Sequence, residues 1–153
     1  MLGGVEEPAR LLGIQVTHTF TDVLGVRPVI GRAFTPEEEW PGADRVVMLS
    51  HAVWQQHFGG DRTIVGRTIR LDTDSYQVVG VMPPRFTFPD FADYWVPAKL
   101  PPDEGERRNQ DVQAIGRLKR GTTVEAARAE LGVLWAGMIR EHPELKRTGT
   151  IRV

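Results

Sequence analysis

The stretch YQVVGVMPPRFTFP, at residues 76–89, most restricts the fold of this chain. Its continuous apolar run has the length and composition of a buried strand, and the paired prolines after it cannot continue the hydrogen bonding of a sheet. Gly80 interrupts the run, and a glycine inside a strand marks a β-bulge or the close approach of another backbone. The stretch therefore predicts a buried strand that is irregular at Gly80 and ends at Pro83.

Other segments of the first hundred residues have patterns typical of strands and helices. Apolar runs predict strands at 14–17 and 45–50, and alternation predicts a β-hairpin from 68–72 and 76–82. Ser50 is placed to cap a helix over 51–58 that Gly59 ends, and a short helix before Gly25 is predicted in the same way. Thr35 and Glu38 have the spacing of a capping box, with Pro36 at the first helical position.

The C-terminal third contains a linker, an alternating segment and the clearest helical pattern. Residues 99–111 combine prolines, a glycine and many charges, so they predict the boundary between two structured parts. Alternation at 112–119 predicts a strand. Thr122 and Glu125 then form a second capping-box pattern, and the helix should end at His142 and Pro143. We expect its apolar face to cover a sheet that includes the strands near 14–17 and 112–119; this face contains Val124, Ala127, Leu131, Leu134, Trp135 and Met138.

Charge and composition exclude several classes of protein. The formal net charge is -1, so the strong positive field of a nucleic-acid binder is absent, and we expect no nucleic-acid partner. No run approaches the roughly 18 to 20 apolar residues of a membrane span, and the first 20 residues lack the pattern of a signal peptide. There are no cysteines, which removes disulfides and thiol chemistry.

Few residues have the spacing that catalysis or metal binding requires. Neither of the two serines, Ser50 and Ser75, stands in a nucleophile elbow. His51 and His57 face different sides of their predicted helix, since helical zinc ligands are four positions apart. The sequence 72–74 begins like a calcium loop but lacks its glycine and its glutamate. We therefore expect no enzyme activity and no metal, nucleotide or other cofactor; a hydrolase that uses Asp90 and Asp93 is the less favoured alternative.

Three phenylalanines lie in MPPRFTFPDF, residues 82–91, which we call the aromatic segment. They can close over the core or anchor a partner. The first interpretation is favoured, because residues 94–96 follow closely and can cover the same core. We also predict that at least one aromatic side chain exceeds what the core needs and that the segment faces a partner or substrate. The candidate contact residues are Arg85, Phe86, Phe88 and Phe91.

An ordered set of motifs resembles the MacB-like periplasmic core domain of ABC transporter permeases, the FtsX-like group. The set covers roughly residues 14–153, and its most specific members are W-x-x-x-F-G-G-D at 54–61 and V-V-G-V-M-P-P at 78–84; the others are VLGVRPVIGRAFTPEEE, ADYWVP and GRLKRGTTVEAARAEL. Two departures are small. The hairpin turn at 72–75 lacks an expected glycine, and His51 stands where tyrosine is more usual.

The resemblance implies a mixed α/β fold of the α+β class. A porter-like part, with a sheet and a helix in two layers, would comprise residues 1–42 and 106–153, and a smaller β-rich subdomain would be inserted over 43–105. The domain would lie outside the cytoplasmic membrane between two transmembrane helices. We accordingly expect the chain to be an excised piece of a longer protein, since it ends within what looks like a strand.

The implied function is mechanical and not catalytic. ATP-driven movement of a cytoplasmic ABC ATPase would be transmitted through the membrane part to this domain, and from it to a substrate for export or extraction, or to a periplasmic partner. Implied partners are the transmembrane helices of the same permease, a second permease copy or paralogue, and a periplasmic adaptor. Alone, the domain should be a monomer. The alternative is a free-standing extracytoplasmic binding or adhesion module that uses residues 86–95.

Overall fold

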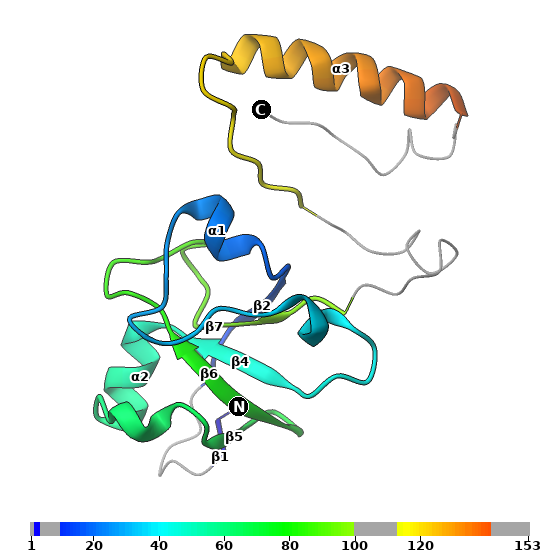
Figure 1. The fold of residues 1–153 in the computed structure, drawn as a ribbon. Coiled ribbons are helices and arrows are strands. Elements are labelled where there is room, and N and C mark those ends of the chain that lie inside the picture. The colour runs from blue at the N-terminus through cyan, green and yellow to red at the C-terminus, as the bar shows by residue number, and fades with distance from the viewer. Residues whose placement is uncertain (1, 4–9, 100–112, 142–153) are drawn as a thin grey trace. The chain divides into compact units, whose positions relative to one another are not determined.

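The computed structural model describes residues 2–3, 10–99 and 113–141 (Figure 1). Contacts within the chain divide it into two units, Met1–Gln113 and Ala114–Val153, which are described separately below. The linker predicted at 99–111 lies almost wholly outside the described residues. None of the helices in the described ranges combines the length and the apolar character needed to cross a membrane.

The first unit is built on one mixed sheet of seven strands. Six of them follow the order β1-β5-β6-β4-β7-β2, and β3 pairs with β6. The pairs β4–β6 and β2–β7 are parallel, and the remaining pairs are antiparallel. The strands are β1 (Leu2–Gly3), β2 (Gly13–Val16), β3 (Ile30–Gly31), β4 (Val46–Leu49), β5 (Thr68–Leu71), β6 (Asp74–Val81) and β7 (Tyr94–Pro97).

Short helices connect these strands, and they begin and end where the sequence predicts. The helix α1 (Phe20–Leu24) ends at Gly25, which has the left-handed φ of 68°. In α2 (His51–Phe58), the Ser50 hydroxyl accepts a hydrogen bond from the Val53 amide, and Gly59 ends the helix. Two 3-10 turns, η1 (Pro36–Glu39) and η2 (Arg62–Ile64), complete the unit.

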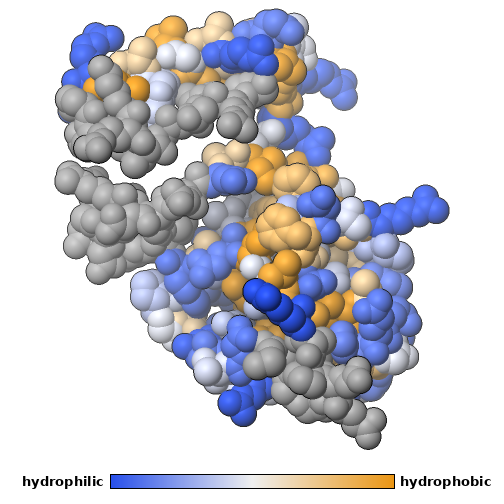
Figure 2. Space-filling model, turned by 180° about the vertical axis from the view of Figure 1, so that it is seen from behind, coloured by the Kyte–Doolittle hydropathy of each residue, from blue (hydrophilic) through white to orange (hydrophobic). Residues whose placement is uncertain are grey.

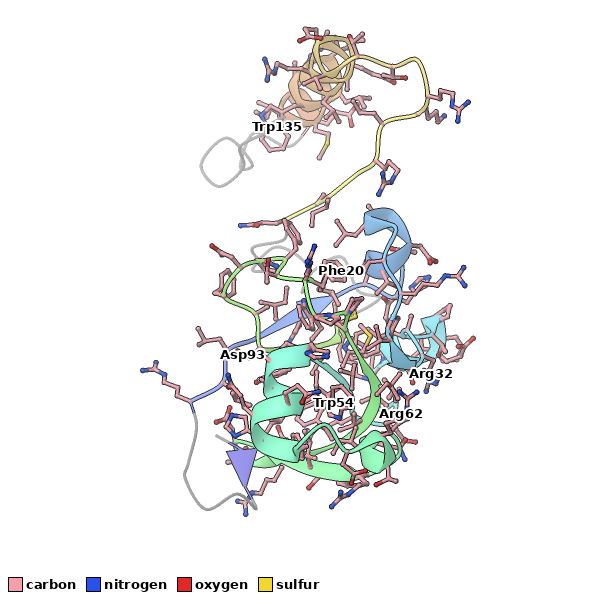
Figure 3. All side chains as sticks on the ribbon, turned by 90° about the vertical axis from the view of Figure 1, so that its left-hand side faces the viewer. Phe20, Arg32, Trp54, Arg62, Asp93 and Trp135 are labelled. Carbon is pink, nitrogen blue, oxygen red and sulfur yellow. The ribbon has the colours of Figure 1, made fainter. Side chains whose placement is uncertain are left out.

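Apolar clusters cover both faces of the sheet, and β4 is therefore buried along its whole length. Val47 and Leu49 pack in a cluster with Trp54 of α2 and Ile64 of η2. The neighbouring positions on β4, Val46 and Met48, pack in a second cluster with Phe20 of α1, Trp95 and Met82. Figure 3 shows Phe20 and Trp54 at separate levels of the first unit. The helices α1 and α2 therefore protect opposite faces of one sheet.

The irregularity predicted at Gly80 is confirmed in both of its forms. β6 has one extra residue against β4, since Val47 pairs with Val78 whereas the next residue, Met48, pairs with Gly80. On its other side Gly80 faces Gly31 of β3. A Cβ atom on Gly80 would lie 2.5 Å from the carbonyl oxygen of Arg32, so a larger residue would force the two backbones apart.

In the second unit the structure describes one long helix, α3 (Val124–Glu141). Its cap is Thr123 and not the predicted Thr122: the Thr123 hydroxyl accepts a hydrogen bond of 3.2 Å from the Ala126 amide. The two threonines are adjacent, so pattern alone could not select between them. The strand predicted at 112–119 is wrong for the described residues 113–119, because alternation forms a strand only beside a second strand, and none is described within this unit. Packing of α3 on a sheet stays a prediction.

The predicted mixed α+β fold is confirmed by the sheet and its helices. The division into a porter-like part and a part inserted over 43–105 stays a prediction. Of its two boundaries, 105/106 falls outside the described residues, and 42/43 falls between η1 and β4. Strand pairing joins the two predicted parts, because β2, within residues 1–42, pairs with β7, within residues 43–105.

Candidate partner-binding surface

The aromatic segment leaves the sheet at the buried end of β6 and is fixed to the core by Phe86. Met82 is fully buried, and the Phe86 amide donates to the Pro83 carbonyl at 3.0 Å, which turns the chain back over the sheet. The half-buried Phe86 ring lies 5.3 Å from the Trp95 ring and 6.1 Å from the Phe20 ring, between centroids. Phe86 is therefore a lid on the cluster that contains Trp95.

The other two phenylalanines of the segment are largely exposed. Phe88 exposes 44% of its surface and Phe91 exposes 54%, and Arg85 is exposed as well. The Phe88 carbonyl accepts a hydrogen bond of 3.3 Å from the Trp95 indole, so its backbone is anchored while its side chain meets solvent. The favoured interpretation, in which all three phenylalanines close the core, is wrong for Phe91. The Phe88 ring lies 6.3 Å from the buried Phe20 ring, between centroids, so it packs on the core along one side only. The exposure of Phe91 agrees with the prediction of an aromatic side chain beyond the needs of the core, and the partner-facing role of the segment stays a prediction.

Asp93 has a structural role at the end of the same loop. Its carboxylate accepts from the Leu12 amide at 2.9 Å, and its own amide donates to the Leu12 carbonyl at 2.8 Å. Its carbonyl accepts from the Ser50 amide at 2.8 Å, so it ties β7 to the start of α2 and to the residues before β2. Figure 3 marks its position. The carboxylate is thus already bound to the backbone, which does not support its pairing with Asp90 in a hydrolase.

A polar network holds the turn η1 beside β3. The Arg32 guanidinium donates to both carboxylate oxygens of Glu38, at 2.6 and 3.2 Å, and the Thr35 amide donates to Glu38 at 2.8 Å. The last contact is the one that the predicted capping box requires. Glu38 is only 9% exposed, and its hydrogen bond raises the pKa of Arg32 above the ordinary value. His18 also binds η1, since its amide donates to Glu39 and its Nδ1 lies 3.1 Å from the same oxygen.

Lys99 completes this network in a way that the sequence did not reveal. Its ammonium group donates to three carbonyl oxygens at the end of η1 and in the turn after it, those of Glu38 at 2.7 Å, Trp40 at 3.2 Å and Ala43 at 3.2 Å. The last carbonyls of a helical turn lack partners within the turn, and a cation placed there binds them favourably. The Trp40 carbonyl also accepts a hydrogen bond from the Ala43 amide. In the sequence Lys99 is only the first residue of a charged linker, and the contact could not be predicted because it joins residues about sixty positions apart.

The surface offers few other features for chemistry. No group of three histidine, aspartate or glutamate side chains within the described ranges is placed to hold a metal ion. A shallow depression of ≈ 300 Å³ is lined by exposed arginines and by apolar residues of α2, η2 and β5. Figure 2 shows apolar side chains gathered on one face of the first unit, among polar ones. The exposed phenylalanines therefore remain the main candidates for contact with a partner.

Comparison with known proteins places this fold in a family. Residues 2–134 match the family model of the MacB-like periplasmic core domain. Among solved structures, the chain is similar to the periplasmic region of MacB from Actinobacillus actinomycetemcomitans, with a TM-score of 0.62, 15% identity, and coverage of 90% of this chain and 61% of that one. It is also similar to the extracellular domain of the noncanonic ABC-type transporter YknZ from Gram-positive bacteria, with a TM-score of 0.46, 18% identity, and coverage of 60% and 46%. No curated protein sequence matches significantly.

The family match spans most of the chain, and the MacB structure shares its fold over nearly the whole length described. At the same time the chain spans 61% of the length of that MacB region. The resemblance that the sequence motifs indicated is confirmed. This chain belongs to the MacB-like periplasmic core domain family and is an extracytoplasmic domain of an ABC transporter permease.

Proposed function

We propose that this domain couples ATP-driven movement on the cytoplasmic side to work outside the membrane, and that it catalyses no reaction itself. The work is the export or extraction of a substrate, or the control of a periplasmic partner. The family match over residues 2–134 carries this proposal. A transporter domain of this kind would act as a body that receives displacement from the membrane helices and passes it on.

The partners follow from the same proposal. The transmembrane helices of the same permease would flank the domain, and through them a cytoplasmic ABC ATPase would drive it. A second permease copy or a paralogue would stand beside it, and an adaptor or a substrate would meet its outer surface. Detached from the membrane helices, the domain should be monomeric, because a weak contact then loses the high effective concentration that the helices provide.

We assign the outer contact to the aromatic segment, with Arg85, Phe86, Phe88 and Phe91 as its residues. Phe88 and Phe91 support this assignment because they are exposed on a backbone that Trp95 and Phe86 hold in place. A preorganised aromatic side chain loses little conformational freedom on binding, and aromatic residues are enriched among the side chains that contribute most to interfaces.

Transport by the full-length permease tests the assignment. Replacement of Phe88 and Phe91 together by alanine should reduce transport severalfold while the protein level and its thermal unfolding stay near those of the wild type. The matched control is Val29→Ala, at a side chain that is 46% exposed outside the segment. Transport at the wild-type rate in the double variant would remove the aromatic segment from the contact, without affecting the family assignment.

A further inference from the structure

A second surface segment presents an aromatic side chain that the core does not use. The loop of residues 35–45, which we call the Trp40 loop, contains η1 and the turn after it. Trp40 is 65% exposed, which makes it the most exposed large apolar side chain among the described residues of the first unit. Solvation of a tryptophan is costly, and this residue type is strongly enriched at the centres of protein interfaces.

The loop holds Trp40 in one backbone conformation. The Trp40 amide donates to the Glu37 carbonyl at 3.2 Å, and the Ala43 amide donates to the Trp40 carbonyl at 3.0 Å. Lys99 then binds three carbonyls of the loop, so each N–H of its ammonium group has an acceptor. Because the backbone is already ordered, a partner that covers the indole would lose little free energy to ordering it.

The charges on the loop select the chemistry of that partner. Glu37 and Asp44 are both exposed, one on each side of Trp40 in the sequence. The nearby basic groups are engaged elsewhere: Arg32 binds Glu38, Arg45 binds Asp74, and Lys99 binds backbone carbonyls. Hydrogen bonds from the backbone and from the Thr35 hydroxyl also hold the pKa of Glu37 below its usual range, and Glu37 is ionised at neutral pH with or without this shift. The loop is therefore an aromatic surface with negative charge.

We propose that the Trp40 loop is a docking surface for a protein partner that presents an arginine or lysine beside apolar side chains. The cation stacks on the indole face, which attracts positive charge, and Glu37 and Asp44 pair with it. Lys99 is a positioning residue, since it sets the backbone that carries Trp40 and makes no contact with the partner. This surface is separate in sequence from the aromatic segment, and its test does not depend on transport.

Calorimetry with a defined probe tests the proposal on this chain. The probe is an end-blocked pentapeptide of alternating leucine and arginine, and the control probe has citrulline in place of arginine. We expect submillimolar binding of the arginine peptide, weakened about tenfold by Trp40→Ala and by citrulline, with binding also falling as salt is raised. Trp40→Ala should not change the unfolding temperature. Equal binding by Trp40→Ala, equal binding of the citrulline peptide, or no binding up to about 1 mM overturns the proposal.

The role of Lys99 has its own pair of variants. Lys99→Met keeps the length of the side chain and removes its donors, so it should weaken binding severalfold. Lys99→Arg retains donors and should restore most of the affinity. Arg67→Met is the matched control, since this exposed arginine pairs with Asp61 outside the loop. Wild-type affinity in Lys99→Met would show that Lys99 does not position Trp40.

Discussion

The aromatic segment and the Trp40 loop both carry exposed aromatic rings, but different forces hold them in place. The aromatic segment is fixed by an apolar contact, because Phe86 packs on Trp95 and Phe20. The Trp40 loop is fixed by polar contacts, chiefly the bonds from Lys99 to three carbonyls. An exposed aromatic side chain can therefore be held in place by an apolar contact, as with the lid Phe86, or by hydrogen bonds, as with the polar clamp that Lys99 forms. Different substitutions should disrupt the two arrangements.

The largest effect is expected at the apolar lid. Phe86→Ala should lower the free energy of unfolding by roughly 2–4 kcal/mol, because it leaves a cavity over the Trp95 cluster. Phe88→Ala, two residues further along the chain and at a side chain that is 44% exposed, is the matched control and should cost less than about 1 kcal/mol. Denaturant unfolding of both variants measures the difference. Equal losses would mean that the two phenylalanines share one role, and would break the distinction between lid and exposed ring.

An intermediate effect is expected at the polar clamp. Lys99→Met leaves three carbonyls without their charged donor, and we expect a loss of about 1–3 kcal/mol in the free energy of unfolding. Some of these carbonyls will bind water in the variant, which keeps the loss below that of Phe86→Ala. Amide hydrogen exchange should also quicken over residues 37–43 while β4 and β6 stay protected. Unchanged exchange in this loop would contradict the clamp.

The smallest effect is a pH dependence in the Trp40 loop. The pKa of Glu37 is lowered, first by the hydrogen bond from its backbone and then by that from the Thr35 hydroxyl. A carboxylate with a lowered folded-state pKa stabilises the fold above its ordinary pKa, and this contribution is lost as pH falls through the folded-state value. Thermal unfolding of Glu37→Gln should thus lie slightly below that of the wild type at pH 7 and converge with it in acid. A gap that widens on acidification would reverse the sign of the argument.

The sequence predicted the local features of the first unit well, since these depend on neighbouring residues. The cap at Ser50, the left-handed Gly25 and the irregular strand at Gly80 all follow from short patterns. It did not predict β7 as a strand, although β7 lies between β4 and β2 in the sheet. Four residues that end at a proline show no clear alternation, and the pairing of β7 with both neighbours is a long-range property.

The candidate sites show the same difference between local patterns, which the sequence reveals, and long-range contacts, which it does not. The aromatic segment was found from sequence because phenylalanines among prolines are conspicuous, yet the sequence could not tell Phe86 from Phe88. That choice depends on the position of Trp95, whose ring contacts the first and whose indole N–H binds the backbone of the second. The clamp at Lys99 left no sequence signal, because a lysine in a charged segment looks like any other solvated residue.

The extra residue in β6 changes which face of the sheet the odd-numbered and even-numbered side chains of this strand contact. Before the bulge, Tyr76 and Val78 contact the cluster beneath α2; after it, Val81 contacts that cluster, although simple alternation would turn it to the other face. Val79 contacts the opposite cluster by ordinary alternation, and the shift lets Met82 join it there. Deletion of a single residue here would turn Val81 and Met82 to the opposite faces of the sheet and would also change where the chain leaves β6 toward the aromatic segment. Length should therefore be less free to vary between Val78 and Met82 than in the hairpin turn a few residues earlier.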